Sequence, residues 1–264
     1  MDGPLGGSRS TRNTAFVAGV LNLITFASSI PALILIEPVL NDPNYILGAG
    51  ADGRVLLGCV LDIVNALAAV GTAVALFSVV KRQHEGLALG FVTSRVLEAA
   101  IIFPGVLALV AVVTMRRNLA GGGGADTAAL AAAGHSLVAL REATFLVGPG
   151  IMPGINALLL GTLMYRSRLV PRAIPVMGLI GAPLLIASAM AVLLGADDQV
   201  SAWSFLAPLP IFFWEPSPGL WITLKGFKPS KITALVVAAS TPPASRAGAV
   251  QPSKTRAGPP RAQL

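Results

Sequence analysis

Residues 55–80 read VLLGCVLDIVNALAAVGTAVALFSVV, an apolar run whose one charged side chain is Asp62. A helix rises about 1.5 Å per residue, so a run of this length crosses the roughly 30 Å of hydrocarbon in a bilayer. The whole chain has the same character, because 54% of its 264 residues are hydrophobic, 12% are charged and the mean hydropathy is +0.75. Soluble domains carry about 25% charged residues. The composition therefore excludes an ordinary soluble protein and indicates a membrane protein.

Five further stretches are apolar and long enough to cross a bilayer. The sequence therefore predicts an all-α fold, a polytopic transmembrane helix bundle with six spans. The predicted spans are residues 14–36, 55–80, 86–115, 134–164, 171–194 and 201–224. The first span follows Arg9 and Arg12, as the core of a signal peptide would, but it is longer than such a core and lacks a small-x-small cleavage site. A retained anchor is therefore favoured over a cleaved signal peptide.

The basic residues divide unequally between the two sides of the predicted bundle. Fourteen of the 19 Lys and Arg residues fall on one side, whereas three fall in the opposite loops, namely Arg54, Arg116 and Arg117. Because Lys and Arg collect in cytoplasmic loops, both ends of the chain are predicted to be cytoplasmic.

The chain is accordingly divided into three segments. Residues 1–13 form a cytoplasmic N-terminal segment, residues 14–227 the transmembrane domain, and residues 228–264 a disordered basic cytoplasmic tail. The charge of the tail favours binding to anionic lipids. The same charge is also what the positive-inside rule alone requires, and both interpretations stay open.

Motifs for soluble catalysis or metal binding are absent from the sequence. The string GAGADG at residues 48–53 fits G-x-G-x-x-G, but it lies in an outer loop rather than between a strand and a helix. His84 and His135 fall in a loop and at an interface, where solvated rings are expected more often than metal ligands. The single cysteine, Cys59, excludes an internal disulfide. We expect no enzymatic activity, no cofactor, no metal and no nucleic-acid partner.

The informative residues are the polar ones within the spans, because each is costly in hydrocarbon and needs a partner, a cavity or water. The charged candidates are Asp62, Arg95, Glu98, Arg141, Glu142 and Glu215, and the amide candidates are Asn22, Asn65 and Asn156. Two of the six charged residues are positive and four are negative. Two carboxylates must therefore be protonated, hydrated or matched by a cation from outside the chain. A purely structural role for this group of residues stays open beside a functional one.

Depth in the bilayer predicts which of these residues meet. Arg95 and Glu98 are three residues apart, so they can pair on one helix. Asp62 and Arg141 both lie about 10 Å from the outer side by helical rise, and they can also meet. Arg95 and Glu215 both lie about 13 Å from the cytoplasmic side, which predicts a second partner for Arg95.

Two further features complete this pattern. Asn22 and Asn156 fall near the level of Arg95 and extend its predicted polar cluster. In the last span, prolines at positions 208, 210, 216 and 218 remove backbone hydrogen bonds. A kink or break is therefore predicted near Glu215.

Four motifs in order resemble a family of bacterial membrane proteins of unknown function, the DUF4386 family. They are RVLLG at 54–58 followed by Asp62, SRVLE at 94–98, LMYRSRLVP at 163–171, and WE at 214–215 leading to KGF at 225–227. The resemblance implies a multi-span helical protein of the bacterial cytoplasmic (inner) membrane, and it supplies no activity, substrate or cofactor. EPSPG at 215–219 departs from the more regular last helix of the family.

Three functions are compatible with these observations. We expect a non-catalytic membrane partner or sensor with a structural network of intramembrane ion pairs, in contact with the bilayer and with anionic lipids through its tail. The alternative is a small-solute or proton-linked transporter that uses the intramembrane carboxylates. An enzyme acting on lipid would need an acid/base pair such as Asp62 with His135, and it is not favoured. A homo-oligomer is compatible with each.

Overall fold

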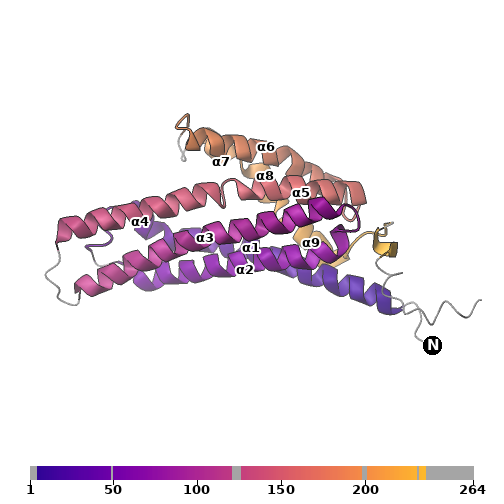
Figure 1. Ribbon diagram of the computed structural model, residues 1–264, viewed down its shortest axis with the longest axis horizontal. Helices are drawn as coiled ribbons and strands as arrows, with labels where there is room; N and C mark the ends of the chain where they lie inside the picture. Colours follow the sequence, from indigo (N-terminus) through magenta and orange to yellow (C-terminus); the bar gives the residue numbers. More distant parts are fainter. Residues whose placement is uncertain (1–4, 49, 121–125, 198–200, 231, 236–264) are drawn as a thin grey trace, which may run out of the picture.

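The computed structural model describes residues 5–48, 50–120, 126–197, 201–230 and 232–235 (Figure 1). These residues form helices and connecting turns, with no strand among them. The helices are α1 (Leu5–Asn41), α2 (Asp52–Val80), α3 (Glu85–Ala120), α4 (Thr127–Val147), α5 (Met152–Ser167), α6 (Ala173–Leu193), α7 (Ala202–Leu206), α8 (Leu209–Trp214) and α9 (Pro216–Lys225). The predicted all-α helical bundle is confirmed.

The number of spans differs from the prediction. Within the described residues, five helical stretches are long and apolar enough to cross a membrane: Thr11–Asn41, Asp52–Val80, Glu85–Asn118, Thr127–Ser167 and Ala173–Leu193. The predicted sixth span, residues 201–224, is instead three short helices, α7, α8 and α9. Its prolines are the reason, since each lacks the N–H that a continuous helix needs. The predicted break at Glu215 is observed, because α8 ends before this residue and α9 begins after it.

The predicted fourth span, residues 134–164, is divided as well. Helix α4 ends at Val147 and α5 begins at Met152, with a turn over residues 148–151 between them. Pro149 has no N–H to donate, and the N–H of Gly150 reaches back to the carbonyl of Phe145 at 2.9 Å. A Cβ atom at position 150 would collide with the carbonyl of Leu146, so the turn requires glycine there. The continuous helix predicted for this span is therefore wrong.

The helices pack in an order that brings the two ends of the fold together. Helices α1 to α4 contact one another in chain order, α5 lies against α3 and α6, α8 lies against α6, and α9 lies against α1. Gly19 on α1 and Gly219 on α9 make the last contact close, because a Cβ atom on Gly219 would lie 3.2 Å from the carbonyl oxygen of Gly19. The break in the last stretch is thereby placed beside the first helix.

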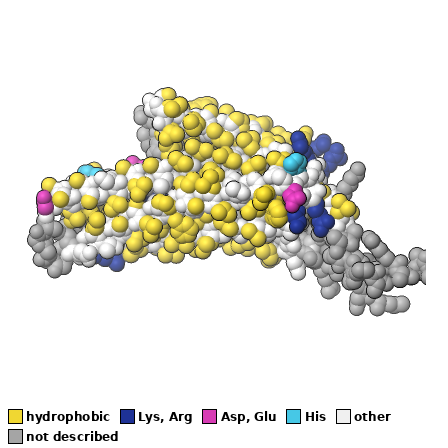
Figure 2. Space-filling model, viewed as in Figure 1, with side chains coloured by type: hydrophobic (Ala, Val, Ile, Leu, Met, Phe, Trp, Pro, Cys, Tyr) yellow, Lys and Arg dark blue, Asp and Glu magenta, His cyan; other side chains and the backbone are white. Residues whose placement is uncertain are grey.

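The molecular surface separates apolar from charged side chains. Figure 2 shows hydrophobic side chains over the middle of the molecule, with Lys and Arg gathered mainly at the end that holds the α5–α6 turn. An apolar middle between charged ends is what a bilayer requires. Together with the long apolar helices, this surface indicates a multi-pass membrane protein.

The two terminal segments differ from their predicted boundaries. Helix α1 begins at Leu5, so residues 5–13 continue the first span as helix. After α9, the N–H of Lys228 donates to the carbonyl of Leu169 at 2.8 Å, and Ile232 is buried. Packed chain therefore extends past residue 227, where the tail was predicted to begin. The remainder of the predicted tail, residues 236–264, lies outside the described residues.

Candidate functional site

One ion pair joins α2 to α4 inside the bundle. Arg141 Nη2 donates to Asp62 Oδ2 at 2.9 Å, and the two residues are only 3% and 7% exposed. Gly105 on α3 leaves room for the arginine, since a Cβ atom at that position would lie 3.0 Å from Arg141 Cδ. The ring of Phe145 lies 5.3 Å from the guanidinium carbon. The predicted pair is confirmed, and it is electrically neutral and enclosed.

A second group of charges lies nearer the basic end, on α3 and α5. Arg95 Nη1 donates to Glu98 Oε2 at 2.9 Å, and Asn156 Nδ2 donates to the same oxygen at 2.7 Å. All three residues are buried. The pairing of Arg95 with Glu98 and the nearby position of Asn156 are therefore confirmed.

Glu215 lies at the junction of α8 and α9 and is held through its backbone. Asn22 Nδ2 on α1 donates to the carbonyl oxygen of Glu215 at 2.6 Å. Pro216 and Pro218 follow in the next turn and leave carbonyl groups without helical donors. Asn22 thus ties the broken segment to α1.

The predicted ion pair between Arg95 and Glu215 is not formed. The ion pairs within 4.0 Å among the described residues are Arg95–Glu98, Arg116–Asp52, Arg117–Asp52 and Arg141–Asp62. Arg95 is instead turned along its own helix toward Glu98, which lies on the next turn. Arg95 and Glu98 still act on Glu215 electrostatically.

These three charged residues line one cavity of about 180 Å³. Its walls come from α1, α2, α3, the α4–α5 turn and the α8–α9 junction, and consist of Thr25, Ser29, Ile30, Leu33, Asn65, Arg95, Glu98, Phe145, Pro149, Pro153 and Glu215. Both interruptions of the long helices therefore meet at this cavity. Irregular backbone at membrane depth occurs where it lines a cavity or is buried in protein.

The charges around the cavity do not balance. Arg95 compensates one of the two carboxylates, and the other leaves an excess of one negative charge when both are ionised. The buried atoms Arg95 Nε and Asn156 Oδ1 also have no hydrogen-bond partner among the described residues. Two carboxylates were predicted to be in surplus without being identified; with Asp62 and Glu98 paired they are Glu142 and Glu215, and the fold places Glu215 at the cavity.

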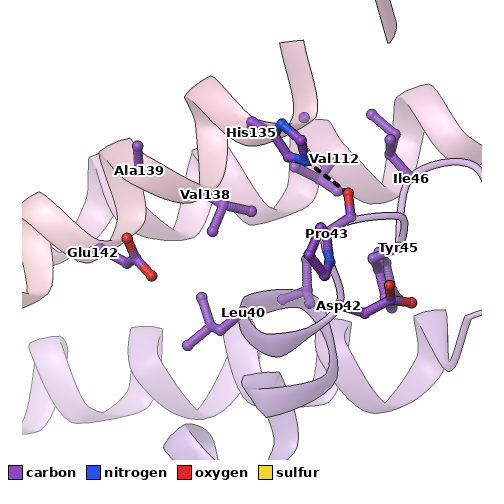
Figure 3. Close-up of a pocket in the computed structure, with 12 residues that line it drawn as sticks. Leu40, Asp42, Pro43, Tyr45, Ile46, Val112, His135, Val138, Ala139 and Glu142 are labelled. Atoms are coloured by element: carbon purple, nitrogen blue, oxygen red, sulfur yellow. Dashed lines mark hydrogen bonds between the residues drawn. The ribbon is translucent and has the colours of Figure 1, made fainter. Parts of the chain in front are cut away.

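The other surplus carboxylate lies apart. Glu142 on α4 is exposed and lines a different cavity, of about 300 Å³, at the end near the α1–α2 loop (Figure 3). His135 lies in the same cavity, where its Nε2 is 2.8 Å from the carbonyl oxygen of Pro43. Glu142 is therefore not part of the group formed by Arg95, Glu98 and Glu215.

The chain matches a protein-family model over the region that contains both charge groups and the cavity. The family model described as "Domain of unknown function (DUF4386)" matches residues 17–226, which include both buried ion pairs and the whole wall of the cavity. The chain belongs to the DUF4386 family. No curated protein and no solved structure matches it. The DUF4386 assignment agrees with the resemblance in the four sequence motifs.

Several residues that line the cavity of this DUF4386 protein were not predicted from the sequence. Thr25 and Ser29 on α1 were not among the candidates, although they follow Asn22 at helical spacing and form a polar stripe with it. Phe145, Pro149 and Pro153 were missed because the α4–α5 turn was not predicted. The signal available for that turn was Gly148–Pro149–Gly150 in the sequence.

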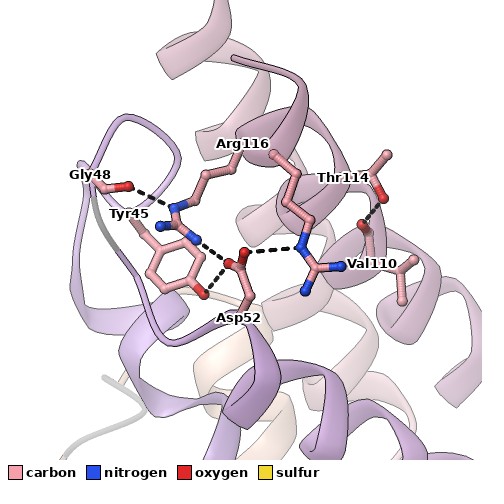
Figure 4. Close-up of polar contacts among 7 residues, drawn as sticks. Tyr45, Gly48, Asp52, Val110, Thr114 and Arg116 are labelled. Atoms are coloured by element: carbon pink, nitrogen blue, oxygen red, sulfur yellow. Dashed lines mark hydrogen bonds and ion pairs between the residues drawn. The ribbon is translucent and has the colours of Figure 1, made fainter. Parts of the chain in front are cut away.

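A separate cluster holds the end of this DUF4386 bundle that lies opposite the α5–α6 turn. Asp52 bonds to Arg116 and, at 3.1 Å, to Arg117, and the hydroxyl of Tyr45 donates to it at 3.2 Å (Figure 4). Burial and the adjacent Asp52 carboxylate raise the pKa of Tyr45 to about 12. Arg116 Nε also donates to the carbonyl of Gly48 at 2.7 Å. Two of the three basic residues in these loops, Arg116 and Arg117, thus hold the α1–α2 loop and the start of α2.

The histidines and the glycine string have local structural contacts. His84 Nδ1 accepts the N–H of Leu87 at 3.2 Å, at the start of α3. The G-x-G-x-x-G string, residues 48–53, ends within the first turn of α2. In the described part of the chain, no group of three or more His, Cys, Asp and Glu side chains is arranged to hold a metal ion.

Proposed function

We propose that this DUF4386 protein is a non-catalytic membrane protein that senses a small, positively charged solute bound in the cavity beside Glu215. The observation that carries the proposal is the carboxyl group of Glu215, which lines a cavity inside an apolar bundle and has no ion-pair partner among the described residues. An uncompensated carboxylate in such surroundings is costly, and a bound cation removes that cost.

The remaining wall supports a small polar ligand. Thr25, Ser29 and Asn65 offer neutral hydrogen-bonding groups around the charged residues. One water needs about 10–15 Å³ of such space, so a cavity of about 180 Å³ admits a solute of several non-hydrogen atoms. The cavity is therefore suited in size and charge to a small organic cation.

Binding is tested with the full chain in phosphatidylcholine nanodiscs. Radiolabelled tetramethylammonium should bind saturably, and Glu215→Gln should weaken that binding at least tenfold. Glu142→Gln is the matched control, because it removes a carboxylate that lies outside the cavity. No saturable binding to the wild type, or equal binding to Glu215→Gln, would contradict the proposal.

Transport is a second candidate, favoured by the two interrupted helices that meet at the cavity. Discontinuous membrane helices form the substrate sites of many carriers. In proteoliposomes, uptake of the same cation should then depend on Glu98 and Glu215. Uptake that is unchanged by Glu98→Gln and Glu215→Gln would count against a carrier.

We further propose the cytoplasmic (inner) membrane of a bacterium as the location, with both ends of the chain in the cytoplasm. The basic end of the molecule supports this orientation. In a Cys59→Ser background, a cysteine at position 8 should be labelled only from the cytoplasmic side. Labelling from outside the cell would reverse the topology.

The basic tail is proposed to bind anionic lipid. The tail of the intact protein should then bind to vesicles that contain phosphatidylserine, and added salt should release it. If deletion after Pro229 leaves membrane distribution and copurifying partners unchanged, the tail has no such role.

A further inference from the structure

A third cavity lies beside the α4–α5 turn. It has a volume of about 270 Å³ and is bounded by the end of α4, by α6 and by the α7–α8 segment. Its wall includes Leu146, Leu185 and Val192 and carries no charged side chain. We call this space the α4–α6 crevice. Its composition is the opposite of that of the charged cavity beside Glu215.

The two spaces share one side chain. Phe145 lines both, and the neighbouring turn residues Pro149 and Gly150 line one space each. The crevice and the charged cavity therefore adjoin at the end of α4 and the α4–α5 turn. Phe145 lies in the last turn of α4, and its carbonyl accepts the N–H of Gly150.

The crevice is also open to the surroundings of the bundle. Leu146, Val192 and Pro208 in its wall are apolar and partly exposed. In a membrane this surface faces hydrocarbon. A ligand that enters here must have an apolar part to leave the lipid and a charged part to remain beside Glu215.

We propose that the ligand is an amphipathic cation with a single hydrocarbon chain, whose charged head lies beside Glu215 and whose chain passes Phe145 into the α4–α6 crevice. This inference rests on the proposed function, since it takes the cation site as given and names the class of cation. The adjoining charged and uncharged spaces match the two ends of such a molecule. One crevice accommodates one chain, which disfavours a two-chain lipid.

The test compares two permanent cations that differ in the chain alone. Octyltrimethylammonium should displace radiolabelled tetramethylammonium from wild-type protein in phosphatidylcholine nanodiscs at a concentration at least tenfold lower than unlabelled tetramethylammonium does. Octyl sulfate, with the same chain and the opposite charge, should not displace it. Empty nanodiscs give the partition of each probe into lipid, which does not saturate.

A matched pair of variants tests where the hydrocarbon chain of the ligand lies. Val192→Phe narrows the crevice, whereas Leu193→Phe adds the same ring at the next residue of α6, which is 50% exposed and lies outside the crevice wall. Val192→Phe should remove the advantage of the octyl chain and leave tetramethylammonium binding unchanged. Leu193→Phe should bind both probes as the wild type does.

The outcomes separate this inference from the proposed function. If both cations bind saturably with equal affinity, the cation site stands and the amphipathic ligand is wrong. If octyltrimethylammonium binds equally well to Glu215→Gln, or if octyl sulfate competes, the placement of the head beside Glu215 is wrong. If neither cation binds, both proposals fail.

Discussion

The two buried charge groups of this protein differ in balance and in enclosure. Asp62 and Arg141 form a neutral pair between two regular helices, with each residue less than one-tenth exposed. Around Arg95, one cation faces two carboxylates beside a cavity of about 180 Å³. A neutral enclosed pair specifies how helices pack, whereas an unbalanced group beside open space has capacity left for a ligand.

The backbone explains why the two groups differ. Gly105 lets α3 and α4 approach closely around Arg141, so the pair is sealed. The group around Arg95 is bounded instead by the α4–α5 turn and the α8–α9 junction, where prolines prevent a continuous helix. Interrupted helices cannot fill the bundle completely, and the cavity lies where they meet.

The largest expected effect tests the neutral pair. Arg141→Ala should lower the free energy of unfolding by about 3–5 kcal/mol, because Asp62 stays buried without a cation. Equilibrium unfolding in mixed micelles measures the loss. The double variant Asp62→Asn with Arg141→Leu should recover most of it. A loss below about 1 kcal/mol would show that the pair does not hold α2 to α4.

A smaller effect is expected at the unbalanced group. Arg95→Ala should cost about 1–3 kcal/mol, because Glu98 retains its bond from Asn156 and the cavity offers space for hydration. The same unfolding measurement applies. Adding Glu215→Ala should offset part of the loss, since one repelling carboxylate is removed. Strict additivity of the two substitutions would show that Arg95 and Glu215 are independent.

A still smaller effect is expected at Glu215 itself. Glu215→Gln should change the unfolding free energy by no more than about 1 kcal/mol, in the stabilising direction, because an uncompensated carboxylate becomes a neutral amide. Glu142→Gln serves as the exposed control. A loss above about 2 kcal/mol would mean that the Glu215 carboxylate has a structural partner and that the two charge groups are alike.

The last prediction concerns the α1–α2 loop, where Tyr45 bonds to Asp52, and its effect appears only at high pH. The pKa of Tyr45 is about 12, above the ordinary tyrosine value of about 10 that applies to the unfolded chain. The folded state therefore favours the neutral phenol, and this stabilisation is complete below about pH 10 and is lost as the pH rises toward 12. Tyrosinate absorbance in a Tyr165→Phe background should show a midpoint near 12.

Comparison with Tyr45→Phe isolates this contribution. The variant should lose less stability above about pH 10 than the intact protein does, since it has no phenol to ionise. Equal slopes in both proteins would show that Tyr45 is solvated and that the enclosed region ends at Asp62.

The sequence predicted contacts wherever regular helices decide them. A constant rise per residue placed Asp62 level with Arg141, and helical spacing placed Glu98 beside Arg95; both ion pairs are present. Similar depth did not suffice for Arg95 and Glu215, because α3 presents Arg95 toward its own Glu98. Depth gives the level of a side chain, but helix rotation, which packing decides, gives its direction.

The irregular backbone was predicted only in part. Four prolines indicated a break near Glu215, but not the division into α7, α8 and α9. The α4–α5 turn was missed because a long apolar run outweighed Gly148–Pro149–Gly150. With that turn, Phe145 and the α4–α6 crevice were also missed, since they depend on where α4 ends.

The contact between the first and last helices has a consequence for biogenesis. Arg12 Nη2 on α1 donates to the carbonyls of Thr223 and Leu224 at 3.1 and 3.2 Å, and Gly226, at φ 72°, ends α9 beside it. Helix α9 leaves the ribosome long after α1, so α1 must wait in the bilayer for its last neighbour. The wall that contains Glu215 is therefore completed late in synthesis. A nascent chain inserted only as far as α6 lacks Glu215 and therefore the proposed ligand site, so the proposal links binding competence to completed translation.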